Sequence, residues 1–184
     1  MSPSMPVASR RAVFLDRDGV LNETLTRGGV PQPPRSPAEL AVLPGVEEAC
    51  SSLRAAGWLL IVATNQPEIA RGTLSRPDVD AINEQLRKRL PLDDVLICPH
   101  DDADRCTCRK PRDGMLQAAA GRWSVDLGVS YMVGDRWRDI EAGRRAGCVT
   151  IHVDRKYKER QPEAPDFVVS SLSQAAEVIL RGVR

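Results

Sequence analysis

The sequence lacks several features that would assign it to a particular class of protein. No apolar run approaches the roughly 20 residues that a helix needs to cross a bilayer, and the opening MSPSMPVASRRA has no apolar segment typical of a secretory signal. An excess of charge is also lacking, since 26 Lys and Arg residues stand against 25 Asp and Glu residues, giving a formal net charge of +1. Neither a basic nor an aromatic stripe for nucleic acid is present. We therefore expect a cytoplasmic, monomeric protein that binds neither membranes nor nucleic acid.

The cysteines do not form the even set that a disulfide framework requires. There are five, of which three lie near His100 between residues 98 and 108, while Cys50 and Cys148 lie in apolar surroundings. This distribution is typical of metal binding in a reducing compartment. The sequence also lacks a G-x-x-x-x-G-K-[ST] motif, which argues against a nucleoside triphosphatase.

The length and composition indicate one globular domain over residues 1–184. Its 42% hydrophobic residues can form a sizeable core without disulfides, and short apolar runs alternate with longer amphipathic segments. These predict strands at 12–15, 58–63, 94–97, 131–133, 149–153 and 167–169, and helices at 44–56, 77–90, 113–122, 137–146 and 172–182. Continuous apolar strands between helices indicate an α/β fold whose mainly parallel sheet is covered on both faces.

Polar residues follow several predicted strands, where a parallel sheet gathers its ligands. They are Asp16-Arg17-Asp18-Gly19, Thr64-Asn65, Gly134-Asp135 and, further along the chain from the third strand, Arg109-Lys110. We expect these four segments to converge at one edge of the sheet. Asp16, Asp18 and Asp135 would then offer the oxygen ligands that Mg²⁺ prefers.

Such a centre suits phosphoryl transfer, in which a carboxylate attacks phosphorus and forms an acyl phosphate. Asp16 is the candidate nucleophile, and Asp18 would protonate the leaving oxygen and then deprotonate a water. Thr64 and Asn65 would bind the phosphoryl oxygens, while Lys110 would offset negative charge between nucleophile and phosphate.

Each of these signals also has an ordinary structural explanation when taken alone. The two aspartates could cap backbone amides in a turn, and a Thr-Asn pair or a single Lys is common in turns and on surfaces. A calcium loop of EF-hand type is excluded, because Leu21 occupies its glycine position and Arg27 its closing glutamate position. The four strand ends together favour the phosphatase interpretation.

The segment 98–108, CPHDDADRCTC, combines three thiols with one imidazole. Four such ligands match a closed tetrahedral zinc site without an open catalytic position. The alternative is a set of buried reduced cysteines, but the segment is polar and loop-like. We predict a structural zinc that orders this loop and directs Arg109 and Lys110 toward the substrate. Its expected ligands are Cys98, His100, Cys106 and Cys108.

Four segments spread over nearly the whole chain resemble the motifs of the haloacid-dehalogenase superfamily of phosphatases. They are FLDRDGVLN (14–22), VATNQ (62–66), CRKP (108–111) and VGDRWRDI (133–140). The resemblance implies a Rossmann-like three-layer fold, with Asp16 as nucleophile, Asp18 as general acid and base, and Asp135 as a Mg²⁺ ligand. The backbone carbonyl of Asp18 would complete the protein ligands. Asp139 would at most orient Asp135 or Lys110.

Caps that select substrates in this superfamily are inserted after the first motif or between the second and third. Here residues 23–43, which include the Pro- and Gly-rich segment 28–37, are expected to form one loop. Residues 66–107 are filled by a helix, a strand and the zinc loop. We therefore expect a minimal cap and an open site, in which short loops and basic residues select a small phosphorylated sugar.

The motifs DRDGVLN, TNQ, C-x-H…C-x-C and RKP resemble the heptose-bisphosphate phosphatase and histidinol-phosphatase branch. The resemblance implies removal of the C7 phosphate from a heptose 1,7-bisphosphate. Arg109 would hold the remaining phosphate, because a guanidinium binds phosphate in a bidentate manner. Arg71 and Arg136 are further candidates.

One departure from the branch bears on the choice of sugar. Pro67-Glu68 stands where the branch usually has Ser-Gly, so a backbone donor is lost and an anion is added. In the first alternative, a histidinol-phosphate phosphatase, Glu68 would contact the substrate amine. The second alternative is a non-catalytic zinc-bearing binding module, against which the intact Asp16 and Asp18 argue.

Overall fold

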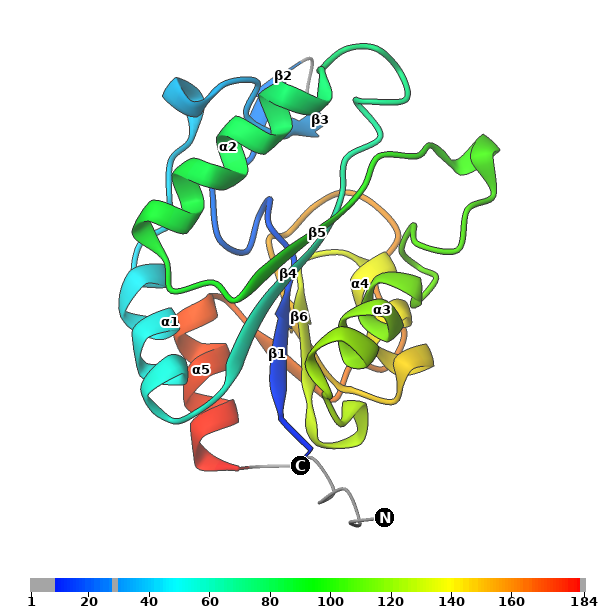
Figure 1. The fold of residues 1–184 in the computed structure, drawn as a ribbon. Helices are drawn as coiled ribbons and strands as arrows, with labels where there is room; N and C mark the ends of the chain where they lie inside the picture. Colours follow the sequence, from blue (N-terminus) through cyan, green and yellow to red (C-terminus); the bar gives the residue numbers. More distant parts are fainter. Residues whose placement is uncertain (1–8, 28–29, 183–184) are drawn as a thin grey trace, which may run out of the picture.

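A computed structural model describes residues 9–27 and 30–182 (Figure 1). The opening residues 1–8 and the pair Gly28-Gly29, for which expectations were stated above, lie outside the described part. A six-stranded sheet forms the centre, in the order β5-β4-β1-β6-β7-β8, and every neighbouring pair is parallel. This confirms the α/β prediction. The strands are β1 (Ala12–Leu15), β4 (Leu59–Asn65), β5 (Asp94–Cys98), β6 (Tyr131–Gly134), β7 (Val149–Val153) and β8 (Phe167–Val169).

Helices cover both faces of the sheet and complete three layers, as Figure 1 shows. Side chains alternate along β1: Val13 and Leu15 enter the core beneath α1 and α5, whereas Ala12 and Phe14 enter the core beneath α3. Both cores are closed because β1 is buried on each face. The helices are α1 (Val46–Ala55), α2 (Arg76–Arg89), α3 (Gly114–Trp123), α4 (Trp137–Ala146) and α5 (Leu172–Arg181).

The start of α2 follows from its sequence. Ser75 accepts a hydrogen bond from the Asp78 amide at 3.2 Å, and the Asp78 carboxylate accepts one from the Ser75 amide at 3.0 Å. This reciprocal capping is the one that a Ser three residues before an Asp makes at the start of a helix. The stripe Val79, Ile82 and Leu86 is buried, so α2 packs on the core through the face that its periodicity indicated.

The segment between the first two motifs differs from the prediction of one loop over 23–43. It contains an antiparallel pair of short strands, β2 (Leu25–Arg27) and β3 (Val30–Gln32), and a 3₁₀ turn, η1 (Pro37–Glu39). Three-residue strands are too short to show an alternating pattern. Pro31 also argued against a strand, because proline lacks the N–H that a sheet needs; here β3 pairs only with β2, and an edge strand tolerates proline. Figure 1 places this hairpin beside α2, at the carboxyl end of the sheet.

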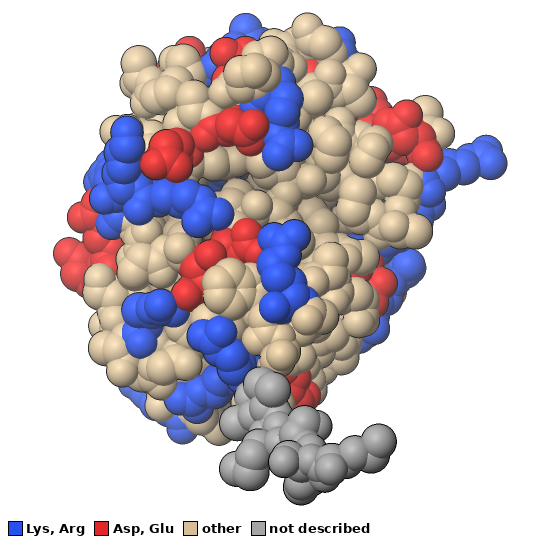
Figure 2. Space-filling model, viewed as in Figure 1, with Lys and Arg blue, Asp and Glu red and all other residues tan. Residues whose placement is uncertain are grey.

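Charges of both signs are interspersed over the face shown in Figure 2, in keeping with the balanced composition. Within 9–27 and 30–182, no helix has the length and apolar character needed to span a bilayer. Two further 3₁₀ turns, η2 (Asp102–Asp104) and η3 (Leu127–Val129), lie in connecting segments. The organisation of residues 1–184 as one domain stays a prediction.

Candidate active site

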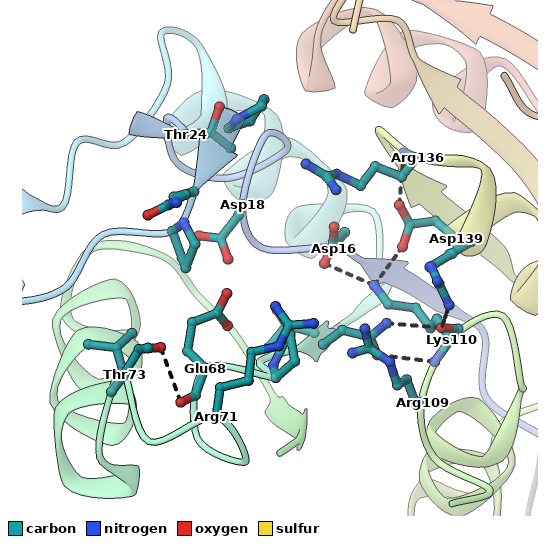
Figure 3. Close-up of a pocket in the computed structure, with 18 of the residues that line it drawn as sticks. Asp16, Asp18, Thr24, Glu68, Arg71, Thr73, Arg109, Lys110, Arg136 and Asp139 are labelled. Atoms are coloured by element: carbon teal, nitrogen blue, oxygen red, sulfur yellow. Dashed lines mark hydrogen bonds and ion pairs between the residues drawn. The ribbon is translucent and has the colours of Figure 1, made fainter. Parts of the chain in front are cut away.

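The sheet order brings the predicted strand ends together. Because β1 lies between β4 and β6, the segments that carry Asp16, Thr64 and Asp135 meet at one edge. Lys110 reaches the same point from the segment after β5, since its ammonium lies 2.9 Å from Asp16 Oδ1. A pocket of about 480 Å³ opens above them, and Figure 3 shows its walls. The expected convergence of the four segments is therefore present.

A buried ion-pair network surrounds Asp16. The Lys110 ammonium donates to Asp16 Oδ1, to Asp139 Oδ1 at 2.6 Å and to the Ala63 carbonyl at 2.7 Å, which uses all three of its donors. Burial alone would lower the pKa of Lys110, but the charges of Asp139 and Asp16 outweigh this effect, so the pKa of the ammonium is raised. Burial and the charge of Asp139 raise the pKa of Asp16 to about 6, although Lys110 counteracts them. Lys110 thus holds Asp16 in place and supplies charge, without a spare N–H for a ligand.

Asp135 carries an unsatisfied buried carboxylate. It is 2% exposed, and neither oxygen accepts a hydrogen bond of ordinary geometry within the described residues, although the Tyr157 hydroxyl lies beside it. Burial, followed by the charges of Asp16 and Asp139, raises the pKa of Asp135 well above its usual range; Arg136 and the Tyr157 hydroxyl offset part of this effect. Such a group requires a cation or a proton.

The three carboxylates form a group that fits a hard cation. One oxygen from each of Asp16, Asp135 and Asp139 lies within 4.8 Å of the others. Gly19 permits this approach: it adopts a φ of +85°, and a Cβ there would lie 1.9 Å from Asp135 Oδ2. The site fits Mg²⁺, because it offers oxygen ligands and an orphaned negative charge. Asp139 also binds Lys110 at 2.6 Å, one of the two contacts that the sequence suggested for it, and it accepts from the Arg136 amide at 3.0 Å.

Asp18 lies at the opposite side of the pocket from Asp139 in Figure 3. The guanidinium of Arg17 donates to both of its oxygens, at 3.2 and 3.0 Å. Gln66 donates to Oδ2 at 2.7 Å, and Asn22 to Oδ1 at 2.9 Å. Sequence reasoning missed these three positioning residues. The available signal was that all three lie inside the quoted motifs, and that Arg17 and Gln66 directly adjoin Asp18 and Asn65.

The Thr-Asn pair ends β4 and has two different environments. Thr64 is 1% exposed, and its hydroxyl accepts from Gln66 at 3.0 Å. Asn65 pairs with the backbone of Lys110, with Oδ1 accepting from the Lys110 amide and Nδ2 donating to the Lys110 carbonyl, each at 3.0 Å. Asn65 therefore positions Lys110, and since it lines the pocket with a second N–H on Nδ2, its contact with the phosphate stays a prediction.

Two arginines that line the pocket, Arg109 and Arg138, are paired with Asp102 of the zinc loop. Arg109 donates to Asp102 at 2.8 Å and to the His100 carbonyl at 3.3 Å. Arg138 binds the same Asp102 through both of its terminal nitrogens, at 3.1 Å each. The zinc loop thus reaches the pocket directly through Asp102, which the sequence analysis did not single out.

The four predicted zinc ligands lie together. Their Sγ and Nδ1 atoms are separated by 3.2 to 3.7 Å in the five pairs that make contact. A tetrahedral zinc with Zn–S of about 2.3 Å and Zn–N of about 2.0–2.1 Å separates its ligands by roughly 3.5–3.8 Å. The side chains of Cys98, His100, Cys106 and Cys108 therefore fit one zinc ion with little movement.

Comparison with known proteins agrees with this geometry. The family model described as HAD-hydrolase-like matches residues 107–175. The D-glycero-beta-D-manno-heptose-1,7-bisphosphate 7-phosphatase of Bordetella bronchiseptica is 37% identical over 143 residues, covering 75% of this chain and 77% of that protein. The D-glycero-D-manno-heptose-1,7-bisphosphate 7-phosphatase of Thermosynechococcus vestitus is 37% identical, covering 92% of this chain and 95% of that protein.

Solved structures give the same result. The crystal structure of the D,D-heptose 1,7-bisphosphate phosphatase from B. bronchiseptica, complexed with magnesium and phosphate, superimposes with a TM-score of 0.81 at 34% identity. The match covers 94% of this chain and 99% of that one. A putative HAD-like phosphatase from Mesorhizobium loti matches with a TM-score of 0.78 at 29% identity, covering 100% of this chain and 92% of that one. This chain is therefore an enzyme that belongs to the haloacid-dehalogenase superfamily of phosphatases, in its heptose-bisphosphate phosphatase family.

Proposed function

We propose that this phosphatase removes the C7 phosphate of D-glycero-D-manno-heptose 1,7-bisphosphate through a phosphorylated Asp16. The observation that carries the proposal is the buried group of three carboxylates, two of them bound to Lys110, beside a pocket that arginines also line. The choice of the heptose as substrate rests on the names of the relatives, which are heptose-1,7-bisphosphate 7-phosphatases.

Asp16 acts as the nucleophile. Lys110 binds its Oδ1, which fixes the rotamer of the carboxylate and leaves Oδ2 to attack phosphorus. The bond from Asp16 to phosphorus forms as the bond from phosphorus to O7 of the sugar breaks. Asp18 gives a proton to the departing O7, so the sugar leaves as a neutral alcohol.

Asp18 also serves the second half of the reaction. It takes a proton from a water that attacks the aspartyl phosphate, and inorganic phosphate then leaves with Asp16 restored. Arg17, Gln66 and Asn22 hold the Asp18 carboxylate in one orientation for both proton transfers. The Thr64 hydroxyl contacts the phosphoryl oxygens, and Asn65 supports the reaction indirectly through Lys110.

Asp16, Asp135 and the Asp18 carbonyl are the proposed protein ligands of Mg²⁺, with Asp139 close by. Bound there, Mg²⁺ supplies positive charge that neutralises the phosphoryl oxygens. The zinc ligands close the loop that ends at Cys108, and Arg109 and Lys110 follow directly, so zinc serves this site by ordering it. Reduced thiolates of this kind suit the cytoplasm.

The anomeric phosphate is proposed to bind at Arg109. This residue lines the pocket, and its guanidinium retains N–H groups beyond those used by Asp102 and the His100 carbonyl. A bisphosphate would thus be held by both ends, with one phosphate at Asp16 and the other at the arginine rim.

The experiment is a comparison of phosphate release from the heptose bisphosphate and from histidinol phosphate, in the presence and absence of Mg²⁺, with ³¹P NMR to identify the phosphate lost. We expect Mg²⁺-dependent loss of the C7 phosphate. Asp16→Asn should lower turnover by on the order of 10³-fold or more while the variant stays folded and binds substrate. The matched control is Asp80→Asn, which removes an exposed carboxylate on α2. Preferred hydrolysis of histidinol phosphate, loss of the C1 phosphate, or turnover near normal in Asp16→Asn would each contradict the proposal.

A further inference from the structure

Glu68 is distinct among the carboxylates that line the pocket. The other four, Asp16, Asp18, Asp102 and Asp139, each bind at least one cation at 3.0 Å or less. The carboxylate of Glu68 makes no ion pair within the described residues and meets only its own backbone amide, while its Oε2 is buried without a partner. A buried acceptor left unsatisfied costs free energy, so this oxygen is placed for a donor that a ligand brings.

The backbone of Glu68 is held firmly at the pocket wall. Its carbonyl accepts from the amides of Thr73 at 2.9 Å and Leu74 at 3.2 Å, and from the Thr73 hydroxyl at 3.3 Å. The Arg71 amide donates to the Pro67 carbonyl at 3.0 Å and closes the same turn. Figure 3 shows the side chain pointing into the pocket, toward Asp18. The carboxylate therefore belongs to a preorganised wall.

The surroundings of Glu68 select the kind of donor. Burial is the main cause that raises the pKa of Glu68, and the charge of Asp18 adds to it, while the residue's own backbone amide, Arg71 and Arg17 act in the opposite direction. The pocket is lined by six basic and five acidic side chains, and the buried carboxylate of Asp135 adjoins Asp16, so the charges of the site nearly balance and do not call for a cationic ligand. A neutral hydroxyl supplies the donor that Oε2 of Glu68 lacks.

We propose that Glu68 is a specificity-determining residue that accepts a hydrogen bond from the hydroxyl on the carbon next to the phosphorylated carbon of the substrate. The inference rests on the proposed function, because it uses the position of Asp18 at the departing oxygen. A carboxylate beside Asp18 reaches the substituent on the neighbouring carbon. In a heptose 1,7-bisphosphate this is the hydroxyl on C6.

The test is a cycle of two enzymes and two substrates. The enzymes are the wild type and Glu68→Ala, and the substrates are the heptose bisphosphate and its 6-deoxy analogue. In the wild type, loss of the hydroxyl should lower kcat/KM by about tenfold or more, the usual range for a hydrogen bond to a charged group. In Glu68→Ala the two substrates should differ by roughly twofold at most, because the partner is gone. Glu84→Ala, which removes an exposed glutamate from α2, should behave as the wild type does.

Several outcomes would overturn the inference. If Glu68→Ala loses the same factor on both substrates, Glu68 acts on the fold or on the general field of the site. If it impairs histidinol phosphate more than the heptose, it recognises an ammonium. If the wild type does not hydrolyse the heptose bisphosphate, the proposed function is wrong, but the role of Glu68 can still be tested. The same cycle is then run with sn-glycerol 3-phosphate and its 2-deoxy analogue.

Discussion

Because the carboxylate of Asp135 is buried without a partner, we predict that it lowers the free energy of unfolding of the protein when no cation is bound. Asp135→Asn keeps the shape of the side chain and removes the charge. The new amide would lie beside Asp16 and Asp139, whose oxygens are within 4.8 Å, and would no longer repel their charges. In the absence of Mg²⁺ the variant should therefore be more stable than the wild type, although the substitution removes a residue of the active site.

The magnitude follows from the burial of this group. An unpaired buried ion costs several kcal/mol, part of which is relieved when the group takes up a proton, so we expect a gain of about 2–3 kcal/mol at pH 7.5. For a chain of this length that corresponds to a rise in Tm of roughly 5–10 °C. The pKa of Asp135 is raised in the folded state, so the wild type loses stability as pH rises above the unfolded value of about 3.9. Below about pH 4 the two proteins should therefore have equal stability.

The assay is thermal unfolding of both proteins with Mg²⁺ omitted and then titrated in. Chelators are avoided because they would also remove zinc. Mg²⁺ should raise the Tm of the wild type. At a hundredfold excess over its Kd, the free energy of unfolding should increase by about 2.7 kcal/mol. The Tm of Asp135→Asn should stay the same. Asp80→Asn serves as the surface control and should lie within about 0.5 kcal/mol of the wild type. A variant less stable than the wild type without Mg²⁺, or one that Mg²⁺ still stabilises, would refute the reasoning.

Two further predictions concern the zinc loop and Asp18. Verified removal of zinc should lower the Tm and reduce kcat/KM by roughly 100-fold, because Arg109 and Lys110 lose the anchor that positions them; full stability and activity in zinc-free protein would contradict this. Asp18→Asn should reduce kcat on the heptose bisphosphate by about 10²–10⁴-fold but reduce formation of the aspartyl phosphate from 4-nitrophenyl phosphate much less, since that leaving group needs little protonation. The check is a burst measurement of aspartyl-phosphate formation from each substrate. If Asp18→Asn slows formation equally with both substrates, Asp18 is not the general acid.

The local architecture of this protein was determined by its sequence. Apolar runs and amphipathic periodicity predicted the six parallel strands and five helices, because burial on one or both faces leaves a periodic pattern that needs no knowledge of partners. The capping of α2 and the grouping of the four zinc ligands followed from short spacings for the same reason. Convergence of Asp16, Thr64 and Asp135 also followed, since parallel strands share their carboxyl edge.

Pairings across the pocket were decided only by the tertiary structure. Asn65 turns to the backbone of Lys110, and Gln66 binds Asp18 from 48 positions away, because the order of strands places these groups together. The hairpin β2–β3 escaped prediction since its strands are too short for a pattern. The open oxygen of Glu68 is the clearest case. A sequence shows that a carboxylate is present, but whether it meets a cation, another acid or only a future ligand depends on distances between segments that fold together from far apart in the chain.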